Sequence, residues 1–163
     1  MLDRRDFLTR ASTLIAATAL LPACGGSTTD TDTDAFDTDS DSSGGGAEVN
    51  DAWETQASDL ELAGVFTAAN PGEWAGKEGS HAPSATATGM DITLITEHGM
   101  EADHWIDVVY LRDQDDIVVG LLEFVGTDAA AEATFTLPEG TTEVTPFSHC
   151  NLHGLWMGDV ISV

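Results

Sequence analysis

The chain has 163 residues, which is enough for one domain with a hydrophobic core but leaves little room for a second. Its 29 acidic residues outnumber 5 basic ones, and the resulting net charge of -24 excludes nucleic-acid binding and a basic membrane-binding surface. Two cysteines are too few for a disulfide framework or a four-cysteine metal site. The chemistry of this chain therefore depends on its two cysteines and five histidines.

Residues 1–23 have the features of an export signal. Arg4-Arg5 and the Asp-Phe-Leu that follows resemble the twin-arginine export signature. The apolar run 11–21 is too short for a membrane-spanning helix, which needs about 20 residues. Residues 21–24, Leu-Pro-Ala-Cys, resemble a lipoprotein cleavage box. We therefore expect an exported lipoprotein facing the periplasm or the cell exterior, anchored by acyl chains on Cys24. The alternative is that Cys24 is an ordinary thiol in a discarded peptide.

Residues 24–46 are a low-complexity run of Asp, Thr, Ser and Gly. Such a segment cannot bury enough apolar surface to offset the entropy of ordering it, so we expect a disordered tether. The sequence then predicts a folded domain over residues 47–163.

The folded part shows an all-β pattern, because short apolar and β-branched runs alternate with turn signals. We expect hairpin turns at 113–116 and 138–140. About seven short strands in this length predict an immunoglobulin-like β-sandwich. The expected strands are 60–67, 91–96, 105–112, 117–125, 133–137, 143–148 and 155–162.

Histidine and cysteine residues form the candidate metal site. Cys150 and His153 have two residues between them and can reach one ion from a single loop. His98 and His104 are separated by five residues that include a glycine, which suits a loop folding back on a common centre. One thiolate with several imidazoles suits iron, copper or zinc, whereas calcium and magnesium prefer oxygen ligands. The five histidines are His81, His98, His104, His149 and His153.

A specific family resemblance rests on residues 150–156, which read Cys-Asn-Leu-His-Gly-Leu-Trp. Together with His-Gly-Met, Asp-His-Trp-Ile and Ser-His-Ala-Pro upstream, it resembles the catalytic domain of superoxide reductases of the neelaredoxin and desulfoferrodoxin type. The resemblance extends from about residue 73 to residue 156. It implies an immunoglobulin-like sandwich that binds one mononuclear non-haem iron.

The resemblance also implies a ligand set and a reaction. The ligands would be four equatorial histidines and one axial cysteine, namely His81, His98, His104, His153 and Cys150, with His149 left over. The implied reaction is one-electron reduction of superoxide to hydrogen peroxide, followed by re-reduction of the iron by a rubredoxin-like or other electron donor. The chain has no cysteines for the extra four-cysteine iron domain of larger members, so it would be of the one-iron type, and a homo-oligomer is compatible with the family.

The sequence departs from the family pattern just before the first ligand. Family members usually have Glu-Lys there, where the lysine attracts superoxide and the glutamate caps the ferric iron; this chain has Gly79-Ser80. Lys77 and Glu78 lie immediately upstream. They take the roles of the family's lysine and glutamate if the loop adjusts, and the alternative is that they are a solvated surface pair. From Cys24 onward the only basic residues are Lys77 and Arg112, so the protein's field should slow an anionic substrate.

Two other functions stay open from the sequence. Cys150, His153 and Met157, with an upstream histidine such as His104, resemble the ligand order of a blue-copper electron-transfer protein. The other alternative is a non-catalytic iron-binding redox module tethered to a membrane.

Overall fold

The structure is a computed structural model, and it describes residues 49–163. The predictions of a signal peptide, of lipidation at Cys24 and of a tether concern residues outside this described part. Within residues 49–163, no helix is both long and apolar enough to cross a membrane.

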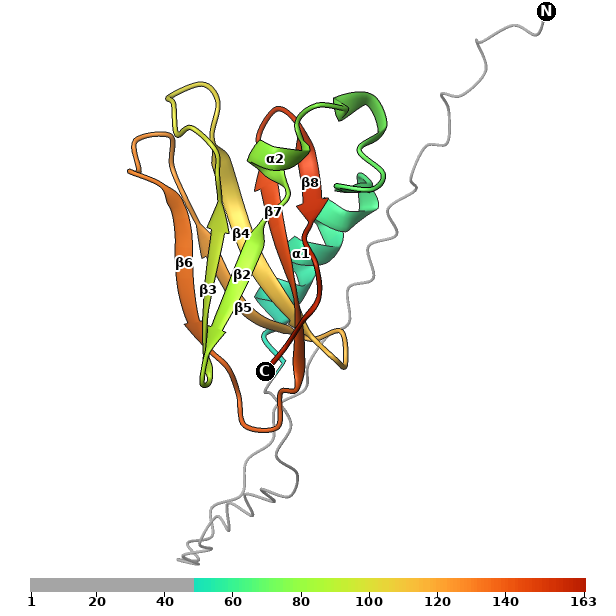
Figure 1. Ribbon diagram of the computed structural model, residues 1–163, viewed down its shortest axis with the longest axis vertical. Helices are drawn as coiled ribbons and strands as arrows, with labels where there is room; N and C mark the ends of the chain where they lie inside the picture. Colours follow the sequence, from blue (N-terminus) through green and yellow to red (C-terminus); the bar gives the residue numbers. More distant parts are fainter. Residues whose placement is uncertain (1–48) are drawn as a thin grey trace, which may run out of the picture. The chain divides into compact units, whose positions relative to one another are not determined.

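Two β-sheets face each other and form a sandwich (Figure 1). The larger sheet has the order β1-β8-β7-β4-β5, with β9 also paired to β7, and the smaller has the order β2-β3-β6. The strands are β1 (Val65–Thr67), β2 (Ser84–Thr88), β3 (Asp91–Thr96), β4 (Ile106–Asp113), β5 (Val118–Glu123), β6 (Ala131–Thr136), β7 (Glu143–Cys150), β8 (Gly154–Met157) and β9 (Ile161–Ser162). The predicted all-β sandwich is confirmed.

Most of the predicted strands end within two residues of the observed ones, and 91–96 coincides with β3. The segment 155–162 is divided between β8 and β9. β2 was not predicted because its Ser, Ala and Thr side chains are mostly exposed and show no apolar alternation. Strands that bury one face are therefore the ones that the sequence pattern reveals.

The N-terminal helix α1 (Asp51–Leu62) corrects the strand predicted over 60–67. Asn50 caps the helix, because its side-chain oxygen accepts hydrogen bonds from the N–H groups of Ala52 and Trp53, each at 3.2 Å. β1 begins only at Val65, after Gly64 with a positive φ of 108°. Only the last part of the predicted strand is extended.

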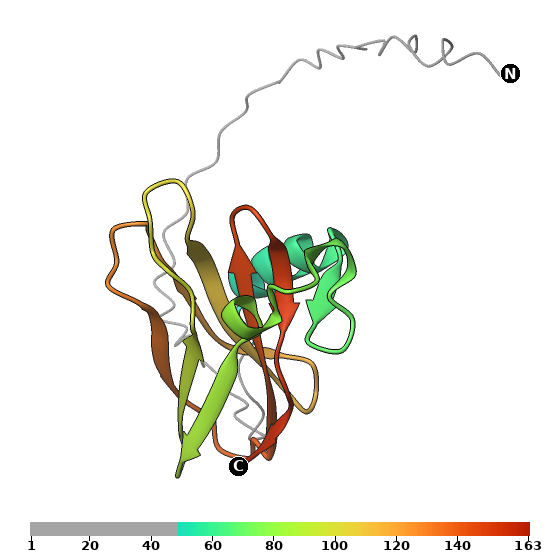
Figure 2. The ribbon, with the colours of Figure 1, turned by 45° about the horizontal axis from the view of Figure 1, so that its top comes forward.

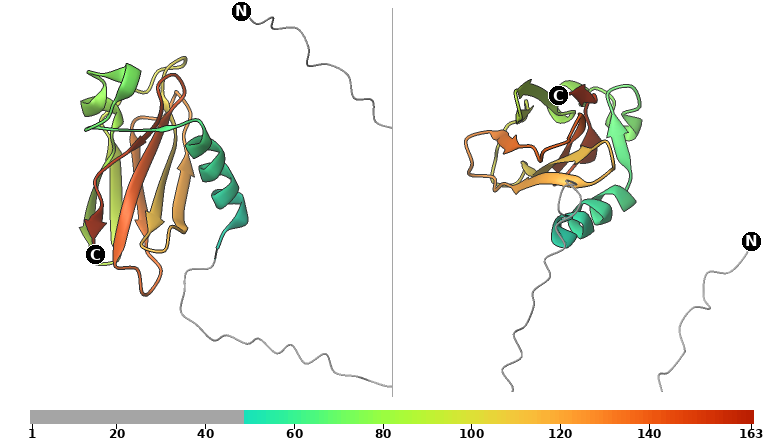
Figure 3. Two further views of the ribbon diagram at one scale, coloured as in Figure 1. Left: turned by 90° about the vertical axis from the view of Figure 1, so that its right-hand side faces the viewer. Right: turned by 90° about the horizontal axis from the view of Figure 1, so that it is seen from below.

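Helix α1 lies on the outer face of the larger sheet (Figure 3). Trp53, Ala57 and Leu60 follow a helical spacing and pack against the sheet residues Tyr110 and Phe147. The face of the same sheet that meets the smaller sheet contributes to the main core. That core contains Ile92, Leu94, Ile106, Val109, Leu111, Ala131, Ala133, Leu137, Val144 and Cys150.

The two predicted turns have different outcomes. At 113–116 a hairpin joins β4 to β5, and the Asp113 carboxylate accepts the N–H groups of Asp115 and Ile117, each at 2.9 Å. The turn at 138–140 joins β6 of one sheet to β7 of the other, so the hairpin predicted there is wrong. Gly140, with a φ of 92°, permits that change of sheet.

Arg112 joins helix α1 to the larger sheet from a buried position. Its side chain is 6% exposed and lies 3.0 Å from the Glu54 carboxylate and 2.8 Å from that of Glu61. Tyr110 donates a further hydrogen bond to Glu61 at 2.8 Å. One of the two cations among residues 49–163 is thus engaged in holding the helix in place.

We predict that Arg112→Met lowers the free energy of unfolding by about 2 kcal/mol, because it leaves partly buried carboxylates unpaired. Chemical denaturation measures the change. Asp116→Asn is the matched control, since this carboxylate is 88% exposed and 3.7 Å from Arg112, and should change stability by less than about 0.5 kcal/mol. Equal effects of the two substitutions would contradict a structural role for Arg112.

Candidate metal centre

Five potential metal ligands converge at one end of the sandwich, and we refer to them as the donor cluster. They come from α2 (Glu78–His81), from the loop between β3 and β4, and from the β7–β8 hairpin. These segments meet at the same end of the domain (Figures 1 and 2). The members are His81, His98, His104, Cys150 and His153, and their donor atoms all lie within 4.8 Å of one another. The structure brings together every residue that the sequence proposed as a ligand.

The donor atoms are in close mutual contact. Nδ1 of His153 lies 3.0 Å from Nε2 of His81 and 3.0 Å from Nε2 of His104. Nε2 of His98 lies 3.1 Å from Nε2 of His104. The sulfur of Cys150 lies 3.4 Å from Nδ1 of His153 and 3.9 Å from Nε2 of His98. His153 therefore presents Nδ1 to the cluster and the other three histidines present Nε2.

These contacts fit a single metal ion. An imidazole nitrogen carries either one N–H or one lone pair, so it serves one strong hydrogen bond. Nε2 of His104 and Nδ1 of His153 each lie within 3.1 Å of two other ring nitrogens. A single hydrogen bond per nitrogen cannot account for both of these contacts. Nitrogens bound at right angles about 2.1 Å from one ion lie about 3.0 Å apart, which is the spacing found. A set of four imidazoles and one thiolate suits a transition metal.

Contacts outside the cluster fix which nitrogen faces inward. Nδ1 of His81 lies 2.8 Å from Oγ of Ser80 and 3.1 Å from the carbonyl oxygen of Lys77. Because the Ser80 hydroxyl donates to that carbonyl at 3.1 Å, Nδ1 carries the proton. Nδ1 of His98 is bonded in the same way to the carbonyl oxygen of Gly99. In both rings the lone pair of Nε2 is then free for a metal.

Asn151 fastens two ligand-bearing segments together. Its Oδ1 accepts the N–H of Trp105 at 3.0 Å, and its Nδ2 donates to the carbonyl oxygen of Asp103 at 3.1 Å. His104 lies between these two residues, so both sides of its backbone are held against the β7–β8 hairpin. The sequence drew attention to Asn151 only as part of the resembling segment, and no local pattern reveals these contacts.

A buried hydroxyl pair links the two sheets close to the cluster. Oγ1 of Thr96 on β3 donates to Oγ of Ser148 on β7 at 2.9 Å, and both residues are buried. Each lies two positions before a ligand, His98 and Cys150 respectively. This bond fixes the separation of the two strand ends that carry those ligands, and it was not predicted.

Burial favours the neutral form of three imidazoles in the cluster. Burial and the neighbouring imidazole of His98 together lower the pKa of His81 to about 4. Burial also lowers the pKa of His98 and of His153. Burial raises the pKa of the Cys150 thiol, and the backbone N–H groups of the following loop act in the opposite direction. These three histidines are therefore ready to bind a metal at neutral pH, while the thiol must release its proton.

Two tryptophans form an apolar wall beside the cluster. Trp74 meets His153 edge-on, with ring centroids 4.7 Å apart. Trp156 is fully buried, lies 5.6 Å from the ring of His81, and donates from Nε1 to the carbonyl oxygen of His153 at 3.1 Å. The wall excludes water from one side of the ligands and limits ring rotation.

His149 lies outside the donor cluster. Its Nδ1 is 2.6 Å from Oδ1 of Asp107, across the pairing of β7 with β4. Side chains alternate along β7, so His149 faces away from the side that Cys150 occupies. This position agrees with its omission from the predicted ligands.

Met157 does not reach the donor cluster. It packs against the apolar residues beneath α1, including Phe147 and Leu155. On β8 it is adjacent to Trp156, whose side chain faces His81, so the two side chains leave opposite faces of the strand. The blue-copper alternative therefore loses its fourth ligand.

Lys77 and Glu78 lie at the beginning of α2, beside the cluster. The backbone carbonyl of Lys77 lies 3.1 Å from Nδ1 of His81. Burial lowers the pKa of His98 and His153, and the positive charge of Lys77 acts in the same direction. The carboxylate of Glu78 accepts the N–H of Gly76 at 2.9 Å, and this bond lowers the pKa of Glu78. Among residues 49–163, Lys77 is the exposed cation, because Arg112 is buried.

We predict that the metal-free protein loses stability as the pH falls from about 6.5 to about 4. An unfolded histidine binds a proton near pH 6.5, whereas His81 in the folded protein resists protonation down to about pH 4, so acid favours unfolding in this window. Denaturant titrations across this pH range measure the slope, which His81→Gln should reduce. An unchanged slope in that variant would contradict the assignment to His81.

The comparisons with known proteins agree with this architecture. A family model described as desulfoferrodoxin matches residues 78–159, which is half of the chain. A search of curated proteins found no match.

Solved structures share the fold. A variant of the superoxide reductase (neelaredoxin) from Ignicoccus hospitalis is 24% identical with a TM-score of 0.55, over 63% of this chain and 94% of that chain. Another structure of the Ignicoccus hospitalis protein is 24% identical with a TM-score of 0.51, over 65% and 95%. The superoxide reductase from Treponema pallidum is 31% identical with a TM-score of 0.44, over 52% and 69%. The Ignicoccus hospitalis structures show that this chain has the same fold.

Proposed function

We propose that this chain, which belongs to the desulfoferrodoxin family, reduces superoxide to hydrogen peroxide at a mononuclear non-haem iron. The observation that carries the proposal is the donor cluster, in which four imidazole nitrogens and one sulfur lie within 4.8 Å of one another. The reaction takes one superoxide ion, one electron and two protons to one molecule of hydrogen peroxide. The chain is then an oxidoreductase that acts on superoxide.

The iron would be held by the donor cluster. His81, His98 and His104 would bind through Nε2, His153 through Nδ1 and Cys150 through its sulfur. The iron supplies the single electron and returns to the ferrous state when an external donor reduces it. Four neutral imidazoles and one thiolate leave a divalent ion with one positive charge, which favours an anionic substrate.

The protein controls the cysteine ligand through its backbone. Burial raises the pKa of the Cys150 thiol, and the backbone N–H groups of Leu152 and His153 act in the opposite direction. These donors stabilise negative charge on the sulfur and hold it toward the histidines. Because Cys150 is fully buried, its sulfur is also protected from water and oxidants.

Lys77 is proposed to attract superoxide. Residues 49–163 contain 20 acidic and two basic side chains, so an approaching anion meets a repulsive field. The exposed ammonium of Lys77 is the local exception beside the ligands. Glu78 would cap the iron in the oxidised protein, a role that requires its carboxylate to leave the amide of Gly76.

Export and lipid anchoring are part of the same proposal. The Arg4-Arg5 signature and the position of Cys24 after an apolar run support a lipoprotein. At a membrane surface, the protein would remove superoxide outside the cytoplasm and take electrons from a redox carrier there.

We predict that the iron-loaded protein forms one hydrogen peroxide per superoxide consumed while a reductant is present, with no release of dioxygen. Dismutation would give one peroxide per two superoxide ions. Pulse radiolysis with peroxide and dioxygen detection separates the two. Cys150→Ala should lose the activity, and His149→Gln, outside the donor cluster, is the matched control that should keep it. Metal analysis showing copper at full occupancy would contradict the proposal.

We also predict that Lys77→Ala lowers the association rate of superoxide by about threefold at low ionic strength. Added salt should speed the variant more than the parent, because it screens the repulsion from the carboxylates. Lys77→Arg keeps the charge and should restore the rate. Pulse radiolysis measures all three proteins, and an unchanged rate in Lys77→Ala would remove Lys77 from the mechanism.

A further inference from the structure

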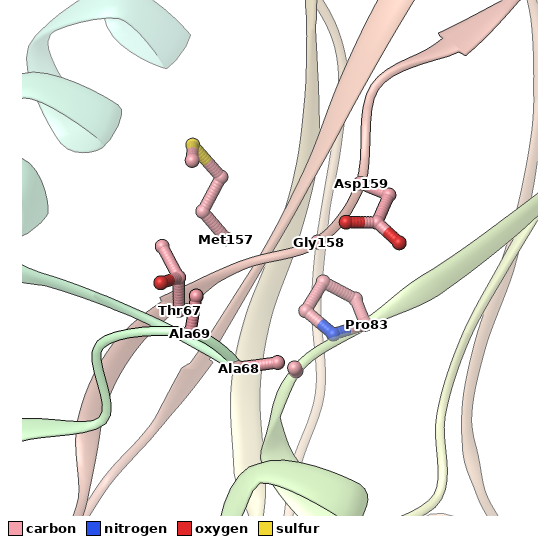
Figure 4. A pocket seen from close by; sticks show the side chains of 8 residues that line it. Thr67, Ala68, Ala69, Pro83, Met157, Gly158 and Asp159 are labelled. Atoms are coloured by element: carbon pink, nitrogen blue, oxygen red, sulfur yellow. The ribbon is translucent and has the colours of Figure 1, made fainter.

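A pocket of about 490 Å³ begins one residue after His81, and no member of the donor cluster lines it. Figure 4 shows the side chains around this pocket. Its walls are small or apolar, and they come from the residues after β1, the residues after α2, and the end of β8. The lining residues are Thr67, Ala68, Ala69, Ala82, Pro83, Met157, Gly158 and Asp159. Nothing in the proposed reduction of superoxide requires this pocket.

Two short connections lead from the pocket to the metal ligands. Ala82 in its wall is bonded directly to His81. Met157 in the opposite wall follows Trp156, whose buried ring lies 5.6 Å from that of His81. A redox carrier seated at the pocket is therefore separated from a ligand by one peptide bond or one aromatic ring.

The pocket suits the side chain of a lysine or arginine. Alanine, proline and methionine side chains provide an apolar surface for a methylene stem. Asp159 at its edge is exposed and makes no ion pair with any of residues 49–163. A basic head group would complete an ion pair there.

Charge over the whole domain favours the same kind of partner. The described residues carry a net charge of -18, from 20 carboxylates and two cations. A field of this size attracts a cationic protein and repels an acidic one during encounter. The family resemblance implies a rubredoxin-like electron donor. The negative charge of this domain favours a donor whose surface is positively charged.

We propose that the electron donor is a basic one-electron redox protein that docks at this pocket through a lysine or arginine side chain. The proposal rests on the proposed function, because the donor passes one electron to the ferric ion and is itself oxidised by one electron. The pocket begins at Ala82, after the C-terminal end of α2, whereas Lys77 precedes its N-terminal end.

The test compares two surface variants of the iron-loaded protein. Asp159→Lys reverses the charge at the pocket, and Glu132→Lys makes the same change on β6, at the edge of the smaller sheet. The probes are a lysine-rich c-type cytochrome and an acidic rubredoxin. Calorimetry measures binding, and stopped-flow absorbance measures reduction of the ferric protein by each reduced probe.

We expect the parent protein to bind the basic cytochrome more tightly than the rubredoxin, with affinity falling as salt is added. Asp159→Lys should weaken cytochrome binding and slow electron transfer by about fivefold more than Glu132→Lys does. Ala69→Trp, which fills the pocket without changing charge, should slow electron transfer similarly. Ala69→Trp, which leaves the charge unchanged, should keep the parent's rate of reaction with superoxide when reduced chemically.

Three outcomes would overturn the inference. They are equal effects of the two lysine substitutions, tighter binding of the acidic probe, and a smaller oligomer in Ala69→Trp than in the parent, which would assign the pocket to contact between copies of this chain. The proposed function is tested separately, because it fails if the chemically reduced parent does not convert superoxide to peroxide, whatever the donor variants show.

Discussion

The structure depends on one constraint, which is that five electron-pair donors from separate segments point toward a single position. Four imidazole nitrogens and a sulfur within 4.8 Å of one another cannot all be satisfied by sharing protons. A bound cation resolves the conflict, and the surrounding contacts prepare for it. Backbone carbonyls hold the outer nitrogens of His81 and His98, so that the inner lone pairs need no rearrangement when the ion binds.

The β-sandwich provides rigid ends on which the ligand loops are mounted. The Thr96–Ser148 hydroxyl pair fixes the distance between the sheets near the cluster, and Asn151 joins the loop that carries His104 to the β7–β8 hairpin. The first bond joins two strands, and the Asn151 bonds join the β3–β4 loop to the turn of the β7–β8 hairpin. The ligand geometry is consequently set by the fold before the metal arrives.

Charge is distributed in a way that separates structural and functional needs. Arg112 is buried among carboxylates and holds helix α1, which leaves Lys77 as the exposed cation of the described residues. A small anion is guided by the local charge beside the ligands, whereas a protein partner responds to the summed charge of the whole surface. The proposed attraction of superoxide therefore depends on the single charge of Lys77, and the proposed docking of a basic electron donor depends on the charge of the whole domain.

The sequence predicted those parts of the structure that leave a local pattern. Strands with one buried face were located because their side chains alternate, and the ligand set was implied by the family resemblance that the segment 150–156 carries. Helix α1 was missed although Trp53, Ala57 and Leu60 have helical spacing after the cap Asn50. The contacts of Asn151, the Thr96–Ser148 bond and the His149–Asp107 pair could not be predicted, since each joins residues more than 40 positions apart.

The central claim is that these five side chains bind one iron ion together. X-ray absorption at the iron edge of the dithionite-reduced protein tests it most directly, because the fine structure distinguishes sulfur from nitrogen neighbours. The account predicts one iron per chain with one sulfur and four imidazole nitrogens, and loss of the sulfur in Cys150→Ala. An iron environment without sulfur in the parent protein, or no iron at all after anaerobic reconstitution, would contradict it.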